Sequence, residues 1–486
     1  MPTRSLVVLA CLASTSQSAI AGELPPPPGH ASSATIAAGR ELFTMNFAKP
    51  SEEKFPRGLG HNGNGLGPLF NETSCVACHN QGGPGGGGSL EHNVDVLGIV
   101  IEGQPKGTAS QIVRDAQAVH PGLSENKPLL LVQRFAAGDS RRVEAYDAWR
   151  DSFFAAFERP SNSMLPRRRS NGVATVELVQ RNTPALWGSG EIESLRQAGG
   201  DEIRRRLADE ITAKKPWITG RPPISLTGDD GWYGWRGQVA SLDGIVRGAC
   251  ASELGIQVEG AAESTHPLLE ERPVRGRKSA TKTVDLTEQQ IHQLVSFVSE
   301  LPRPVRRTPD ASNSQIVMAG EKAFESVGCA DCHVPDLGSV KGMYSDQLLH
   351  DMGPQTSDVQ ISAPLRRTRT VTRSQAGLPS GGGYYEMGGS VTTLMQDIRT
   401  TEVTGIVPTR RAMEWKTPPL WGVRDSYPYF HDGRAPTLKD AIRMHGGEAE
   451  KSAQEFNALD EASQNALITF LESLTLPAEQ ERFATR

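Results

Sequence analysis

Apolar residues recur along the chain with the spacing of amphipathic helices in several places. The segment 287–297 opens on Thr287 with Gln290 three positions later, a capping signature that precedes an apolar face. Segments 38–43 and 319–324 are typical of opening helices, and 466–471 indicates a final helix. We therefore expect a mainly α fold.

Two stretches follow a different pattern. Segments 129–134 and 173–179 are rich in β-branched and apolar residues, as strands are. They predict a small β-hairpin within the first half of the chain.

The first residues have the pattern of an export signal. A short basic start precedes an apolar stretch at 5–13, and Ala19-Ile20-Ala21 fits a cleavage site, so we predict a signal peptide at 1–21. The proline-rich segment 22–33 reads as a tether. The apolar stretch is too short to span a bilayer, and no other sustained apolar run follows. We expect a periplasmic protein without a membrane span.

Net charge bears on the expected partners, and the glycine and proline content bears on the expected loops. The 486 residues suffice for two or three domains, and a net charge of −5 gives no reason to expect nucleic acid as a partner. The 50 glycines and 33 prolines suggest long loops, which suit a core filled by a cofactor.

Two C-x-x-C-H motifs carry the clearest chemistry. They are Cys75-Val76-Ala77-Cys78-His79 and Cys329-Ala330-Asp331-Cys332-His333. In this motif two thiols bond to the vinyl groups of a haem, and the next histidine binds its iron. A zinc knuckle would need further paired ligands, and a redox C-x-x-C pair usually follows a strand. The motifs therefore predict two covalently bound c-type haems, with His79 and His333 as iron ligands.

One further cysteine follows the predicted signal peptide outside the motifs. Cys250 lies on a predicted helix, where free cysteine is usually a small buried apolar residue. We expect it to be part of the core.

The surroundings of the two motifs repeat. Phe43 and Phe324 precede them in similar segments, and the Thr-Pro-x-Leu-Trp-Gly sequence at 183–188 recurs at 417–422. The first copy also carries a glycine-rich insertion at 58–65. We predict two cytochrome c-like haem domains at 34–308 and 309–486. The β element is inserted in the first, and a linker lies near 302–307.

The two copies then diverge in their candidate second iron ligands. His431, Met444 and His445 follow the second tryptophan, whereas no histidine or methionine follows Trp187 at the equivalent place. The second haem can therefore be closed for electron transfer, while the first keeps a position open to peroxide or oxygen. His92 or His120 could close the first haem instead.

Four segments carry a resemblance to a known family. They lie at 67–74, 231–235, 344–353 and 428–434. The chain resembles the bacterial di-haem cytochrome c peroxidase superfamily, and within it the branch of di-haem thiol oxidoreductases or peroxidases. The resemblance implies that the N-terminal haem reacts with peroxide. The C-terminal haem would relay electrons from a small redox protein or a quinol-derived donor.

The resemblance also implies roles for individual residues. The second ligand of the C-terminal haem would be His445, where the peroxidases have methionine. Trp187, and less so Trp421, would lie between the haems, unless both are ordinary core residues. Calcium often lies between the domains of such peroxidases, but no dedicated ligand loop is visible here.

Four more polar residues are candidates near the haems. Glu191, and after it Glu193, follow Trp187 and could serve as acid or base over the open face, or else lie solvated in a turn. His350 and Arg434 could bind haem propionates, the alternative for His350 being an ordinary hydrogen-bonded histidine.

Two rival functions stay open. Di-haem enzymes of the same superfamily cleave polyisoprene with O2, so an oxygenase is the nearest alternative. A non-catalytic electron carrier, with both irons closed, is the other. Whether the first iron has an open face would discriminate between them.

Overall fold

The computed structural model describes most of the chain between residues 31 and 476. The predicted signal peptide, most of the tether and the insertion at 58–65 lie outside the described residues. The described residues are 31–49, 66–100, 107–124, 128–157, 166–225, 228–261, 263–264, 266, 268–269, 284–307, 311–358, 365–369, 382–387, 390–396 and 410–476.

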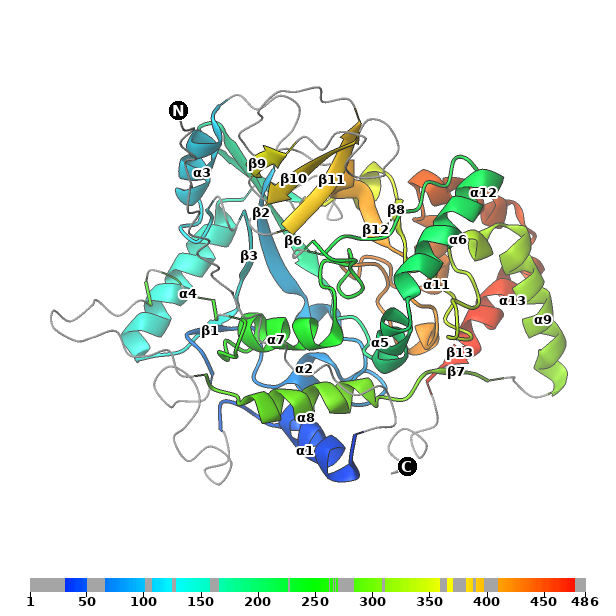
Figure 1. Ribbon diagram of the computed structural model, residues 1–486, viewed down its shortest axis with the longest axis horizontal. Coiled ribbons are helices and arrows are strands. Elements are labelled where there is room, and N and C mark those ends of the chain that lie inside the picture. The colour runs from blue at the N-terminus through cyan, green and yellow to red at the C-terminus, as the bar shows by residue number, and fades with distance from the viewer. Residues whose placement is uncertain are drawn as a thin grey trace, which may run out of the picture.

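Two helix pairs form the repeated framework of the molecule (Figure 1). Helix α1 (Ser33–Thr44) packs across α8 (Glu288–Ser299), and α9 (Ala311–Ser326) packs across α13 (Glu461–Glu472). A glycine lies at each crossing. A Cβ on Gly39 would lie 1.9 Å from the Gln293 carbonyl oxygen, and one on Gly320 would lie 1.9 Å from that of Ala466. Only glycine permits so close an approach of two backbones.

The predicted helices are confirmed, and their caps explain where they begin. The Ser32 hydroxyl accepts from the Thr35 N–H at the start of α1, and Thr287 and Gln290 form a reciprocal capping box on α8. Helix α7 (Leu242–Glu253) carries Cys250, which is buried as expected.

The β element is larger than predicted. Four antiparallel strands lie in the order β3 (Leu129–Val132), β2 (Val94–Val100), β6 (Ala174–Arg181) and β5 (Arg167–Asn171). The two predicted strands exist, but they do not form a hairpin with each other, because β2 lies between them and pairs with both. Strand β6 instead forms its hairpin with β5. Helices α3 (Ala109–Gln117) and α4 (Ser140–Ala155) bury apolar residues against the sheet.

The remaining elements connect these units. The helices are α2 (Cys75–Cys78), α5 (Ser189–Gln197), α6 (Gly200–Lys214), α11 (Leu438–Arg443) and α12 (Glu450–Ala458). The 3-10 turns are η1 (Leu90–His92), η2 (Cys329–Asp331), η3 (Pro354–Thr356), η4 (Arg410–Met413), η5 (Val423–Asp425) and η6 (Gly447–Ala449). The strand groups are β1 (Leu69–Phe70) with β4 (Phe135–Ala136), β8 (Leu349–Asp351) with β12 (Glu414–Lys416), and β9 (Leu365–Arg369), β10 (Gly382–Met387) and β11 (Ser390–Gln396).

The predicted linker is tied to a distant part of the chain. Its strand β7 (Val305–Arg306) pairs with β13 (Leu474–Thr475). The segment between the two haem motifs is thus held by residues that follow the last described helix.

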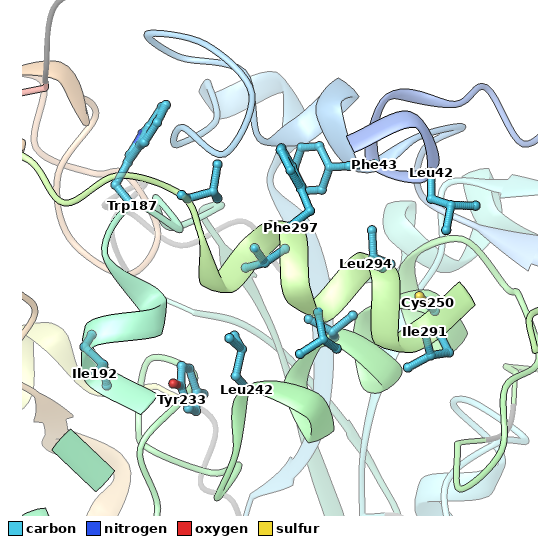
Figure 2. Packing of buried hydrophobic residues seen from close by; sticks show 14 of the residues in the cluster. Leu42, Phe43, Trp187, Ile192, Tyr233, Leu242, Cys250, Ile291, Leu294 and Phe297 are labelled. Atoms are coloured by element: carbon cyan, nitrogen blue, oxygen red, sulfur yellow. The ribbon is translucent and has the colours of Figure 1, made fainter. Parts of the chain in front are cut away.

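The largest apolar core contains residues from both predicted domains. It joins Phe43, Trp187 and Phe297 from the first to Met343 and Trp421 from the second. Figure 2 shows the part of this cluster around α8, with Phe43 and Phe297 facing each other and Trp187 beyond the end of the helix. No described helix is long and apolar enough to cross a membrane.

Candidate haem sites

The histidine of each motif is fixed in the same way. The Nδ1–H of His79 donates to the Gly86 carbonyl at 3.2 Å, and that of His333 donates to the Tyr344 carbonyl at 2.9 Å. Because a carbonyl only accepts, each Nδ1 must carry the hydrogen. Burial lowers the pKa of both rings to about 4. Each imidazole is therefore neutral at neutral pH and offers the lone pair of Nε2, as an iron ligand requires.

The aromatic surroundings of the two histidines also repeat. The ring of Phe43 lies 6.3 Å from that of His79, and the ring of Phe324 lies 6.5 Å from that of His333. Each phenylalanine also contacts one on the partner helix, at 5.2 Å and 5.3 Å. The duplication seen in the sequence is therefore a duplication of packing around both motifs.

None of the four motif cysteines, all within the described residues, forms a disulfide bond. Burial raises the pKa of Cys78 and of Cys329 to about 12, so both stay protonated at neutral pH. This distinguishes them from a redox-active C-x-x-C pair, whose attacking thiol has a low pKa. Thiol pairs followed by a neutral histidine fit covalently bound haem at both motifs.

The second site has a candidate for its second iron ligand in the predicted place. Burial lowers the pKa of His445, and its Nδ1–H donates to the Ala441 carbonyl at 2.7 Å. Burial lowers the pKa of His333, and His445 lowers it further to a smaller degree. His431 lies elsewhere, stacked on Trp415 at 3.6 Å.

The first site differs from the second in the histidines that lie near it. The pKa of His79 responds to burial and to the carbonyls of Gly86 and Pro184, and to no second histidine. Of the two alternatives, His120 packs among the aromatic side chains of the inserted sheet unit. His92 does lie at the motif, where a ring nitrogen comes within 4.8 Å of the Cys78 sulfur and a Glu72 oxygen.

The two candidate acid–base residues have different surroundings. The carboxylate of Glu193 is buried and accepts hydrogen bonds from the Tyr233 hydroxyl at 3.0 Å and the Leu242 N–H at 3.2 Å, besides an ion pair with Arg196. These donors give Glu193 a structural role in joining α5 to α7. Glu191 is partly exposed, 3.4 Å from the Arg303 guanidinium, and is the better placed of the two to exchange a proton.

The two predicted propionate-binding residues are paired with protein carboxylates. The ring nitrogens of His350 lie 2.9 Å from Asp346 and 2.7 Å from Glu448. Burial opposes a charge on His350, but the nearby Asp346 outweighs it and raises the pKa well above 6.5. Arg434 pairs with Asp432 at 2.6 Å. The structure thus gives His350 the hydrogen-bonded role that was its alternative, and the propionate roles stay predictions.

The two repeated tryptophans lie in the core that both halves share. Trp187 and Trp421 are buried, and a Cβ on Gly188 would lie 2.6 Å from the Trp421 ring. It is therefore Trp421 that packs on the segment following Trp187. The bridging role of Trp187 stays a prediction.

A buried polar network around Trp415 and His431 was not foreseen. Asp358 forms an ion pair with Arg181 and lies 3.3 Å from His431, while the Arg236 guanidinium lies 4.1 Å from the ring centre of Trp415. Apart from His431, which lies in the segment 428–434, these residues match no motif. They are far apart in the sequence, so sequence reasoning had no signal for the network.

The described residues contain two groups close enough to hold a metal ion. They are Glu72, Cys78 and His92, and Cys332, Asp346 and His350. Each offers a single carboxylate beside a motif cysteine and a histidine, whereas calcium prefers a shell of oxygen ligands. Calcium stays a prediction without an assigned site.

Comparison with known proteins supports a di-haem redox protein. Residues 409–474 match the family described as "Di-haem oxidoreductase, putative peroxidase". Over 164 residues, 32% of this chain, the sequence is 29% identical to hydrazine synthase subunit gamma of Kuenenia stuttgartiensis. The matched region spans 42% of that subunit.

Two solved structures show weaker likeness. Kuenenia stuttgartiensis hydrazine synthase, pressurised with xenon, aligns over 97% of this chain and 100% of its own, with a TM-score of 0.38 and 14% identity. A MauG-like protein associated with microbial copper homeostasis aligns over 42% of this chain and 58% of its own, with a TM-score of 0.24 and 15% identity. Neither likeness is close enough to assign the fold. The residues that match the family model include His431 and His445.

Proposed function

We propose that the protein is a periplasmic di-haem c-type oxidoreductase that reacts with peroxide at the N-terminal haem and passes electrons through the C-terminal haem. The observation that carries the proposal is the difference between two otherwise repeated sites. His445 lowers the pKa of His333 and holds its own Nδ1–H on the Ala441 carbonyl at 2.7 Å, whereas no histidine among the described residues acts on the pKa of His79.

The chain's own residues would divide the work as follows. Cys75, Cys78 and His79 hold the first haem, and Cys329, Cys332 and His333 hold the second. Each haem, when bound, supplies an iron that gains and loses single electrons. Reducing hydrogen peroxide to two waters takes two electrons and two protons. Glu191 would move a proton, because its carboxylate is partly exposed and only loosely paired with Arg303.

The proposal includes an electron donor and a compartment. A small redox protein or a quinol-derived donor would deliver electrons to the second haem. Covalent attachment suits a protein exported to the periplasm, because the cofactor cannot be lost by dissociation. The predicted signal peptide supports this location.

Electron paramagnetic resonance of the ferric protein, before and after peroxide, tests the proposal. We expect one high-spin and one low-spin haem, with peroxide consuming the high-spin signal. Glu191→Gln should slow the peroxide reaction, whereas Glu202→Gln, an exposed carboxylate of α6 paired with Arg206, should leave it unchanged.

Other outcomes would support the rivals. Two low-spin haems that stay unchanged after one-electron reduction would indicate an electron carrier and contradict the enzyme proposal. A stable O2 adduct on the reduced protein, with no reaction towards peroxide, would indicate an oxygenase.

A further inference from the structure

The loop 344–348, next to the second motif, is irregular yet completely buried. Ser345, Asp346 and Gln347 are each 0% exposed. Tyr344 and Gln347 have φ angles of 53° and 57°, in the left-handed region that side chains disfavour. Such a residue is strained and persists only where surrounding contacts enforce it.

This loop supplies the hydrogen-bond acceptor for the iron-ligating histidine. The Tyr344 carbonyl accepts from the Nδ1–H of His333 at 2.9 Å, and the Asp346 N–H donates to the Cys332 carbonyl at 3.0 Å. The strained backbone is therefore what aims an oxygen at the ring of His333.

An arginine from the first predicted domain holds the loop. Arg204 of α6 is 0% exposed, and its Nη1 donates to the Gln347 carbonyl at 3.3 Å and to the Gly231 carbonyl at 2.8 Å. Its Nη2 donates to Asp201 at 2.9 Å, and the guanidinium lies 3.7 Å from the ring centre of Trp232. The planar group is thus fixed from three sides, with one donor directed at the strained residue.

Lys416, from the second predicted domain, also contacts Gln347. The Nζ of Lys416 donates to Oε1 of Gln347 at 2.8 Å. The main-chain oxygen of Gln347 therefore accepts from Arg204, and its side-chain oxygen accepts from Lys416.

The first site is built differently. The acceptor for His79 is Gly86, in a loop where Gly82, Gly83 and Gly85 take the positive φ angles without strain. Glycine adopts these φ angles without steric cost, so that loop needs no outside contact to enforce them. The loop at the second site instead carries side chains at its positive-φ positions.

We propose that Arg204 is a positioning residue for the second haem, acting across the two predicted domains by holding the loop that hydrogen-bonds His333. The strength of the Nδ1–H hydrogen bond sets how strongly the imidazole donates to iron, and with it the stability of the ferric state. The inference rests on haem at the second motif, but not on any reaction with peroxide.

Redox titration of the haem-loaded Arg204→Lys protein tests the proposal, with each haem followed by its own spectrum. Lysine keeps the positive charge but cannot reproduce the fork. The loosened loop should weaken the hydrogen bond to His333. The midpoint potential of the second haem should therefore rise, while that of the first stays unchanged. Arg206→Lys, at an exposed position of the same helix, is the matched control and should change neither.

A milder variant covers the case in which Arg204→Lys does not fold. Asp201 anchors Arg204 and is partly exposed, so Asp201→Asn loosens the guanidinium without removing it. We expect a smaller upward shift of the second haem alone. An unchanged potential in the folded variant, or an equal shift of both haems, would overturn the proposal. Because potentials are measured without peroxide, a failed peroxidase proposal would leave this result interpretable.

Discussion

At the scale of single residues, neighbours decide the chemistry of the buried histidines. His333 faces a carbonyl and burial keeps it neutral, whereas His350 lies between two carboxylates and is charged. His431 is neutral against Trp415. These three histidines therefore differ in their contacts, and His350 differs from the other two in its charge.

The charge on His350 predicts a pH-dependent contribution to stability. Its folded pKa lies well above 6.5, so this contribution is complete below that pH and is lost as the pH rises through the folded value. His350→Gln should cost about 3–5 kcal/mol below pH 6.5, since it leaves Asp346 and Glu448 without a cation. Urea unfolding at several pH values checks this. The half-buried His292→Gln serves as the control, and a cost that grows with pH would contradict the prediction.

The identity of the second iron ligand predicts a redox effect. Methionine ligation gives a higher potential than histidine ligation. His445→Met should therefore raise the midpoint potential of the second haem and leave the first unchanged, as seen by redox titration. If neither the potential nor the spectrum of the second haem changed, His445 would not be its ligand.

Residue types in a motif could be predicted from the sequence, whereas their partners could not. The C-x-x-C-H spacing is local, and it identified His79 and His333 without knowledge of the fold. The partners of Glu193 and His350 come from distant segments, such as Tyr233 and Glu448, so no local pattern could show that these side chains were already engaged.

At the scale of elements, glycines set how closely the helices pack. Gly39→Ala should force α1 away from α8 and cost about 1–3 kcal/mol, because its Cβ would meet the Gln293 carbonyl. Gly248→Ala in α7 is the matched control. No atom lies within 4 Å of its Cβ, so it should stabilise the protein by about 0.5–1 kcal/mol. Chemical denaturation measures both, and equal effects would contradict the packing argument.

The helices were predictable because amphipathic spacing and caps are local, as on α8. Strand β2 was missed because its mostly buried run of residues shows no alternation of polar and apolar positions. Its place between β3 and β6 depends on pairing across long sequence distances, which also explains why the expected hairpin was wrong.

At the scale of the whole molecule, the shared core predicts cooperative unfolding. Trp421 and Trp187 belong to one cluster, so neither half can open without exposing the other. Thermal unfolding of the haem-loaded protein should show coincident transitions for both haem spectra. Trp421→Ala should lower the free energy of unfolding, followed by either haem spectrum, by about 3–5 kcal/mol. Trp217→Ala should have little effect, because Trp217 is 51% exposed. Two separate transitions would show that the halves are independent.

The position of Leu476 in this core has a consequence for biosynthesis. It packs in the same cluster as Phe43 and Trp187, although more than four hundred residues separate it from the first of these. A ribosome makes the chain from its N-terminus, so the first haem site stays unfinished until nearly all described residues have been made. A nascent chain that stops near residue 308 would expose the apolar surface that Met343, Trp421 and Leu476 cover, and it would need a chaperone to stay soluble.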